Sequence, residues 1–141
     1  MKILLDSNVA IDVILQNEPF YESASIVIGL SKGGVDLFVS ASTVTDIYYI
    51  VSRAMKSKKI AMSLLKKLLA KVDVAAISGS EIRKAVNLDW GDFEDAVQYV
   101  TGESIAVDYI VTRNKKDFAS ATLPVVSPDE LLALLNKSKT E

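Results

Sequence analysis

The sequence contains no cysteine and no histidine. The lack of cysteine excludes a disulfide framework and a thiolate nucleophile. The lack of histidine excludes an imidazole base, and the two absences together exclude a zinc site built on sulfur or imidazole ligands. Any catalytic chemistry in this chain must therefore rely on oxygen-bearing side chains.

Long apolar runs and an excess of basic residues are also missing. The apolar run Ile3–Leu5 ends at Asp6, which is too early for a signal peptide or a membrane span of about 20 residues. With 16 basic and 18 acidic residues the net charge is -2, so the chain has no global basic field of the kind that attracts nucleic acid. We therefore expect a cytoplasmic protein with no membrane segment, in which any nucleic acid is bound by a local patch.

The chain is instead rich in short apolar runs that alternate with segments of helical periodicity. Its 141 residues are enough for one domain that buries about two-thirds of its unfolded surface. Strands are predicted at residues 3–5, 37–39, 72–77, 109–112 and 124–126, and helices at about 9–15, 21–32, 43–55, 60–70, 79–87, 93–100 and 131–135. This alternation predicts an α/β fold, a three-layer α/β/α sandwich with a central, mostly parallel sheet. We assign residues 1–136 to a single domain and expect residues 137–141 to form a frayed tail.

Acidic and amide side chains lie where this fold would bring them together. Asp6 and Asn114 follow predicted strands, and Asp46 and Asp95 lie near the first turns of predicted helices that begin on the same side. In a parallel sheet, ligands collect outside the carboxyl ends of the strands. Helical winding also places Asp92, Asp95 and Tyr99 on one face, away from the apolar stripe that includes Phe93.

Carboxylates from distant segments repel one another at separations of roughly 3 to 6 Å unless a cation lies among them. A hard divalent ion with oxygen ligands, most plausibly Mg²⁺ or Mn²⁺, would remove that repulsion. Such an ion activates water and stabilises charge on a phosphate. The pattern therefore predicts metal-assisted hydrolysis of phosphodiester bonds.

Five stretches of the sequence resemble, in the same order, the PIN domain family and within it the bacterial toxin-like PIN nucleases. They read LLDSNVAIDVIL, STVTDIYYIV, DFEDAVQY, IVTRNKKDF and LPVVSPDELL. The resemblance covers nearly the whole chain. It implies an α/β/α sandwich, a Mg²⁺- or Mn²⁺-dependent endoribonuclease, a homodimer, and an antitoxin protein as a partner.

The resemblance also implies roles for individual residues. Asp6 and Asp95 match the first and third metal-binding acids of the family, and Asp46 falls where many members have glutamate. Asn114 lies at a fourth position, where many members have aspartate, so Asp117 or Asp92 could supply the missing charge. This makes Asp6, Asp46 and Asp95 the candidate catalytic residues, and these three with Asn114 and Asp117 the candidate metal ligands.

Substrate contacts are expected from neighbours of these residues. Asn8 and Thr112, with Ser7, could position a water or a phosphate group. Arg113 and Lys115 flank the expected metal site, where the backbone of an RNA substrate would lie. The basic residues of the segment 53–67 have a simpler interpretation as a solvated helix face, and Tyr48, Tyr49 and Tyr99 as core or dimer packing.

Each acidic residue also has a purely structural interpretation. Asp6 and Asp92 could cap the helices that follow them, and Asp95 could stabilise a helix macrodipole. Two other functions stay open. Asp46 and Asn114 are compatible with a non-catalytic PIN-like module that binds RNA or regulates. A phosphatase or receiver domain is less compatible, because Asp6-Ser7-Asn8 lacks the second aspartate that an aspartyl phosphatase needs.

Overall fold

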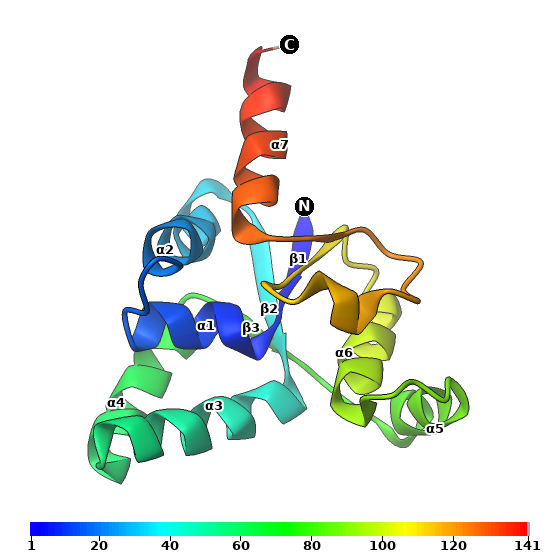
Figure 1. Cartoon of the computed structure of the whole chain (residues 1–141), viewed down its shortest axis with the longest axis horizontal. Coiled ribbons are helices and arrows are strands. Elements are labelled where there is room, and N and C mark those ends of the chain that lie inside the picture. The colour runs from blue at the N-terminus through cyan, green and yellow to red at the C-terminus, as the bar shows by residue number, and fades with distance from the viewer. Residues whose placement is uncertain (141) are drawn as a thin grey trace.

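The middle layer of the molecule is a five-stranded parallel sheet (Figure 1), as the sequence predicts. The computed structural model describes residues 1–140, and the side chains of residues 1–138. The sheet has the order β3-β2-β1-β4-β5, and its strands are β1 (Lys2–Leu5), β2 (Asp36–Ser40), β3 (Asp73–Ala75), β4 (Tyr109–Val111) and β5 (Val125–Val126). All neighbouring strands are parallel, so the carboxyl ends of all of them lie along one edge.

Helices cover both faces of the sheet (Figure 1). The helices on one face are α1 (Ser7–Ile14), α2 (Tyr21–Gly29), α3 (Ala41–Met55), α4 (Lys58–Leu69) and α7 (Pro128–Thr140). On the other face are α5 (Gly79–Asn87) and α6 (Phe93–Ser104). Short 3₁₀ helices, η1 (Leu30–Gly33) and η2 (Lys115–Phe118), complete the elements. No helix within residues 1–140 has both the length and the apolar character needed to cross a bilayer.

Strand β1 shows how the sequence builds the two cores. Ile3 and Leu5 are fully buried against the first group of helices, and Leu4 is fully buried against the second. Side chains alternate between the faces of a strand, so a continuous apolar run supplies both layers at once.

The carboxyl edge is also where the chain changes from strand to helix. Asp6 caps α1 by accepting a hydrogen bond from the backbone N–H of Ser7, and Ser40 caps α3 by accepting one from Thr43. These caps satisfy backbone donors that would otherwise be unpaired at the first helical turns. Asp6 after β1 and Ser40 at the end of β2 therefore place polar side chains along the same edge of the sheet.

The ends of several elements differ from the prediction. Strand β3 is shorter than predicted, and α7 continues past Leu135 through most of the segment expected to fray, projecting beyond the body of the molecule (Figure 1). Glu141 lies outside the described residues. Phe93, expected in the buried stripe, is 49% exposed because it occupies the first position of α6, ahead of the turns that pack on the sheet.

Candidate active site

Asp6 is the most tightly held acidic side chain at the carboxyl edge of the sheet. It is only 6% exposed. Its Oδ1 atom accepts hydrogen bonds from the backbone N–H of Ser7 at 2.7 Å and from Gln98 Nε2 at 3.0 Å. Its Oδ2 atom accepts from Thr112 Oγ1 at 2.7 Å and from Asn8 Nδ2 at 3.3 Å. Donors from α1, α6 and the end of β4 therefore stabilise this buried carboxylate and fix its orientation.

Two of these donors are residues predicted to position a water or phosphate. Asn8 and Thr112 lie beside Asp6, as expected, and both direct a side-chain donor to its Oδ2 atom. Gln98 is a residue that sequence reasoning missed. The available signal was a glutamine within the otherwise apolar, buried part of a helix, and Gln98 is 5% exposed.

Asp95 faces Asp6 from the first turn of α6. Burial, together with the negative charges of Asp92, Asp6 and Asp117, raises the pKa of the half-buried Asp95 carboxyl to about 7. Asp92 also caps α6, since its Oδ1 atom accepts a hydrogen bond from the backbone N–H of Asp95 at 3.1 Å. The capping interpretation of Asp92 is thus correct, and it places this carboxylate beside the others.

Helix α3 contributes Asp46, which lies in its second turn because the helix begins at Ala41. Several causes together raise the pKa of Glu94 to about 7: first a hydrogen bond between its carboxyl group and that of Asp46, then burial, then the charges of Asp46, Asp92 and Asp95. Glu94 is a second residue that sequence reasoning missed, and its position directly before Asp95 was the signal.

These carboxylates form one group, which we call the acidic cluster: Asp6, Asp46, Asp92, Glu94, Asp95 and Asp117. They come from the end of β1, from α3, from the start of α6 and from η2, so segments far apart in sequence meet at one edge of the sheet. Burial, the hydrogen bond between carboxyl groups and the repulsion between neighbouring charges all contribute to the raised pKa values of Asp95 and Glu94.

The donor chemistry of the acidic cluster fits a hard divalent cation, because every group in it is an oxygen ligand. Among residues 1–138, however, no three acidic side chains form a ready-made metal site. Asp6 already receives protein donors, and its contacts with Ser7 Oγ at 3.4 Å and Asn8 Nδ2 at 3.3 Å are its longest. These are the contacts that a cation on Asp6 would replace most easily.

The predicted basic contacts have protein partners. Arg113 Nε lies 2.6 Å from Asp12 Oδ2, and Arg113 Nη2 lies 3.2 Å from Asp12 Oδ1. Lys115 Nζ lies 2.9 Å from Glu130 Oε1, in an exposed pair. The positive charges of both residues are therefore balanced within the chain, and their role in RNA binding stays a prediction.

Asn114 and Tyr99 have different surroundings. The exposed Asn114 precedes η2, and its backbone N–H donates to Thr112 Oγ1 at 3.0 Å. Tyr99 is 5% exposed and stacks on Trp90 with ring centroids 4.9 Å apart. Tyr99 therefore packs in the core between the sheet and helices α5 and α6. This agrees with the prediction of core packing and not with a position on an acidic helix face.

Comparisons with known proteins agree with this architecture. The chain is 27% identical over 135 residues to Ribonuclease VapC1 of Aquifex aeolicus (strain VF5), an alignment that covers 92% of each chain. It resembles the structure of VapBC2 from Rickettsia felis bound to a promoter DNA fragment, with a TM-score of 0.68, 18% identity, and coverage of 90% of this chain and 98% of that one. It also resembles a toxin-antitoxin complex from Klebsiella pneumoniae, with a TM-score of 0.64, 22% identity, and coverage of 89% and 97%.

The family match spans most of the described fold. Residues 2–116 match the PIN domain. This range contains β1 to β4, and with them all members of the acidic cluster except Asp117. The sheet order, the capped carboxyl edge and this match together identify the chain as a member of the PIN domain family.

Proposed function

We propose that this chain is a divalent-metal-dependent endoribonuclease and the toxin of a toxin-antitoxin pair. The observation that carries the proposal is the acidic cluster, in which carboxylates from four separate elements lie close enough that burial and the charges of Asp92, Asp6 and Asp117 raise the pKa of Asp95. Its setting supports the proposal, because a PIN-domain chain with a relative named as a ribonuclease is the context in which such a cluster would cleave RNA.

The side chains of the acidic cluster and its neighbours suggest separate roles in metal binding, orientation and proton transfer. Asp6 and Asp95 would hold a Mg²⁺ or Mn²⁺ ion, with Asp46, Asn114 and Asp117 at its outer positions. When bound, the ion would supply an activated water and a positive charge toward the scissile phosphate. Gln98 and Thr112 keep the Asp6 carboxylate oriented toward that position. Because the chain has no histidine, a carboxylate of the acidic cluster would serve as the proton acceptor.

Two isosteric substitutions test the activity. Asp6→Asn and Asp95→Asn should each abolish cleavage of single-stranded RNA in the presence of Mg²⁺ or Mn²⁺, because each removes a charge that holds the ion. The control is Asp73→Asn, which makes the same change at an exposed position at the amino end of β3, away from the cluster. Undiminished cleavage in both site variants would contradict the proposal.

The second candidate function is a non-catalytic module that binds RNA or regulates. Asp46 and Asn114 motivate it, because each departs from the residue that many family members carry. This alternative predicts that calorimetry detects no divalent binding at millimolar concentrations and that the parent chain does not cleave RNA when Mg²⁺ or Mn²⁺ is added.

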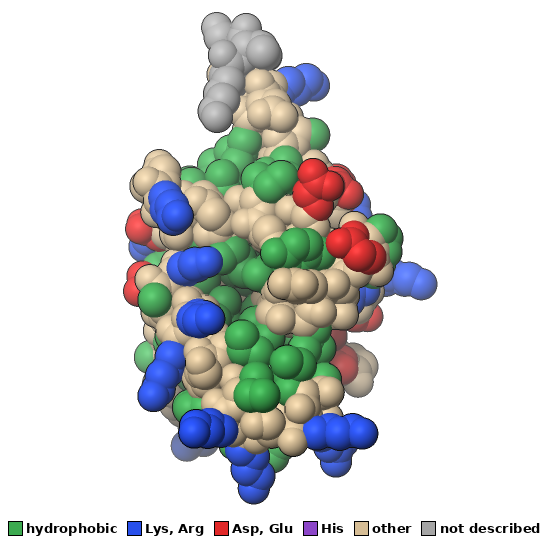
Figure 2. Space-filling view, turned by 90° about the vertical axis from the view of Figure 1, so that its left-hand side faces the viewer, with side chains coloured by type: hydrophobic (Ala, Val, Ile, Leu, Met, Phe, Trp, Pro, Cys, Tyr) green, Lys and Arg blue, Asp and Glu red, His purple; other side chains and the backbone are tan. Residues whose placement is uncertain are grey.

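The antitoxin partner is supported by the helical face made by α1, α2 and α4. Figure 2 shows hydrophobic side chains across the middle of this face, Lys and Arg side chains mainly along its left and lower margins, and Asp and Glu side chains at its upper right. A cavity of about 180 Å³ between α1, α2 and α4 is lined by Val13, Ile28 and Leu64, among others, with Lys67 and Lys71 at its border. We infer that an antitoxin segment covers this face and reaches the acidic cluster with an arginine or lysine. The product of a neighbouring gene, co-expressed with this chain, should then inhibit RNA cleavage.

A further inference from the structure

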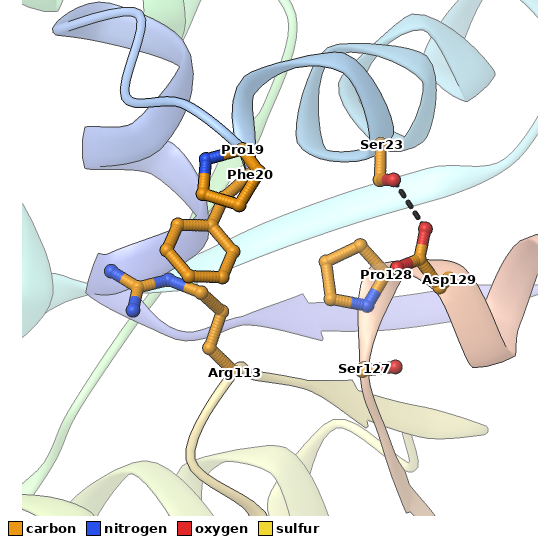
Figure 3. A pocket seen from close by; sticks show the side chains of 7 residues that line it. All are labelled: Pro19, Phe20, Ser23, Arg113, Ser127, Pro128 and Asp129. Atoms are coloured by element: carbon orange, nitrogen blue, oxygen red, sulfur yellow. Dashed lines mark hydrogen bonds between the residues drawn. The ribbon is translucent and has the colours of Figure 1, made fainter.

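A second cavity, of about 270 Å³, lies at the carboxyl ends of β4 and β5 (Figure 3). Its lining comes from three segments and includes Pro19, Phe20, Ser23, Arg113, Pro128 and Asp129. We call it the ring pocket, because two prolines and a phenylalanine line it. It is smaller than the roughly 300–1,000 Å³ of pockets that enclose drug-sized ligands, so it has room for one flat ring system.

The ring pocket is connected directly to the acidic cluster. The backbone N–H of Arg113, a lining residue, donates to Asn8 Oδ1 at 3.3 Å. Asn8 Nδ2 in turn donates to Asp6 Oδ2 at 3.3 Å. Two hydrogen bonds, with Asn8 between them, therefore lead from the pocket wall to the central carboxylate, so the ring pocket lies near the acidic cluster.

Flat surfaces form opposite walls of the pocket. The guanidinium carbon of Arg113 lies 4.1 Å from the centroid of the Phe20 ring, and Phe20 is 41% exposed. In Figure 3 Pro19, Phe20 and Arg113 lie on one side, and Pro128 with Asp129 lies on the other. An exposed aromatic ring beside a planar guanidinium is the kind of surface on which nucleobases stack.

The charges of the lining favour a neutral ring over a phosphate. Arg113 is already paired through two nitrogens with Asp12, which is 1% exposed, so its charge is balanced, and its guanidinium lies against the Phe20 ring. Asp129 adds a negative charge on the opposite side. Its Oδ1 atom accepts a hydrogen bond from Ser23 Oγ, and the carboxylate keeps lone pairs for one more donor.

We propose that the ring pocket binds one nucleobase of single-stranded RNA next to the cleavage position. The base stacks on the exposed part of the Phe20–Arg113 pair, and Asp129 accepts a hydrogen bond from its exocyclic amino group, as acidic side chains do with cytosine. Adenine, cytosine and guanine, which all carry an exocyclic amino group, are therefore preferred over uracil. The proposal rests on the proposed function, because it adds a specificity site to the same substrate path.

The test measures binding and cleavage separately. Fluorescein-labelled octanucleotides of adenosine, cytidine or uridine are titrated with the intact chain in EDTA, and binding is followed by anisotropy. Phe20→Ala should weaken binding of the adenosine and cytidine oligomers by about 5- to 150-fold, the range that stacking of one base on an aromatic ring contributes. Asp129→Asn should reduce the preference for these oligomers over uridine. In cleavage assays Phe20→Ala should raise KM and leave kcat nearly unchanged.

Matched variants separate stacking from a structural effect. Phe20→Leu keeps an apolar side chain but no ring and should be as weak as Phe20→Ala, whereas Phe20→Trp should bind as tightly as the parent. Val86→Ala, which changes an exposed apolar residue of α5, is the control and should have no effect. Parent-like binding by Phe20→Ala, or recovery by leucine, would overturn the proposal.

The two proposals fail in different ways. If the parent binds the oligomers through Phe20 but cleaves no RNA with Mg²⁺ or Mn²⁺, the proposed function falls and the ring pocket stands. If the parent cleaves RNA and Phe20→Ala binds and cleaves as the parent does, only the ring pocket falls. An absence of RNA binding by the parent in EDTA also overturns the pocket, and the cleavage assay still decides the function.

Discussion

The surroundings of Asp95 change the acidity of its carboxyl group, because burial and three neighbouring carboxylates raise its pKa from 3.8 to about 7. A group whose pKa is higher in the folded state than in the unfolded chain binds its proton more tightly when folded. Its contribution to stability is therefore complete at acidic pH. That contribution is lost as the pH rises from about 4 to about 7, and Glu94 acts with the same sign.

We therefore expect Asp95→Asn to gain stability relative to the parent as the pH rises through this window in EDTA. The amide cannot ionise, so the variant does not acquire the repulsion that the parent acquires. Thermal unfolding of both proteins at pH 4, 5.5 and 7 measures the difference. Added Mg²⁺ should then raise the Tm of the parent at pH 7 more than that of the variant. A constant difference between the two proteins across the pH series would contradict this account.

Gln98, in α6, donates a hydrogen bond to Asp6, but only one of its two polar side-chain atoms has a hydrogen-bond partner. Its Nε2 atom donates to Asp6 Oδ1 at 3.0 Å, while its Oε1 atom is buried with no hydrogen-bond partner. A buried acceptor without a partner is unfavourable by about 1–3 kcal/mol, so Gln98 is not optimal for stability alone. Its position is better explained by the orientation of Asp6.

We expect Gln98→Leu to lower the rate of RNA cleavage by about tenfold or more while the free energy of unfolding changes by less than about 1 kcal/mol. The loss of a donor to the carboxylate is offset in stability by removal of the unpaired Oε1 atom, but Asp6 is no longer held in one orientation. Urea unfolding and initial cleavage rates check the two parts. A rate equal to that of the parent would remove Gln98 from the site.

At the scale of elements, the Asp12–Arg113 pair ties α1 to the segment after β4. Asp12 is 1% exposed and Arg113 is 30% exposed, and Asn17 Nδ2 adds a hydrogen bond to Asp12 Oδ1 at 3.1 Å. The same pair holds the backbone of Arg113 where its N–H reaches Asn8. The exposed Lys115–Glu130 pair, which ties η2 to α7, offers a natural comparison.

We expect Asp12→Asn to lower the free energy of unfolding by about 1–3 kcal/mol. Breaking a fully buried ion pair costs about 3–5 kcal/mol, and the partial exposure of Arg113 reduces that figure. Lys115→Ala should cost less than about 1 kcal/mol, because both partners of its pair are exposed. Urea unfolding of the two variants and the parent gives the comparison, and equal losses in both would show that burial does not govern these pairs.

Several elements could be predicted because their signals are local. Four helices have an N-cap residue of a type that favours this position, aspartate or serine. These residues are Asp6, Ser40, Ser78 and Asp92. The end of α7 could not be predicted in the same way. The polar residues 137–141 are predicted to form a frayed tail, but the helix that begins at Pro128 continues to Thr140.

At the scale of the whole molecule, apolar side chains remain on the surface. Exposed examples include Ile26 on α2, Tyr49 on α3, and Ile60 and Met62 on α4. In a chain whose composition is 50% hydrophobic, such surface favours a second copy of the chain or a partner. We expect both the homodimer interface and the antitoxin interface to bury part of this exposed apolar surface.

We expect the isolated chain to form a homodimer at micromolar concentration, because pairing would bury part of this helical surface. Size-exclusion chromatography with light scattering measures the mass directly, and Ile60→Glu, which places a charge on α4, should lower the dimer fraction if α4 takes part. A single-chain mass throughout the micromolar range would argue against self-association.

The sequence by itself determined the order of strands and helices along the chain, the sites of the caps, and the position of Asp6 at the end of a strand and of Asp46 and Asp95 in the early turns of helices. These features could be predicted because periodicity and capping depend on neighbours a few residues away. Only the tertiary structure decided that Gln98 reaches Asp6, that Glu94 meets Asp46, and that Arg113 turns to Asp12 and Phe20. These contacts join residues from separate elements, and their geometry depends on how the helices pack against the sheet, which no local pattern encodes.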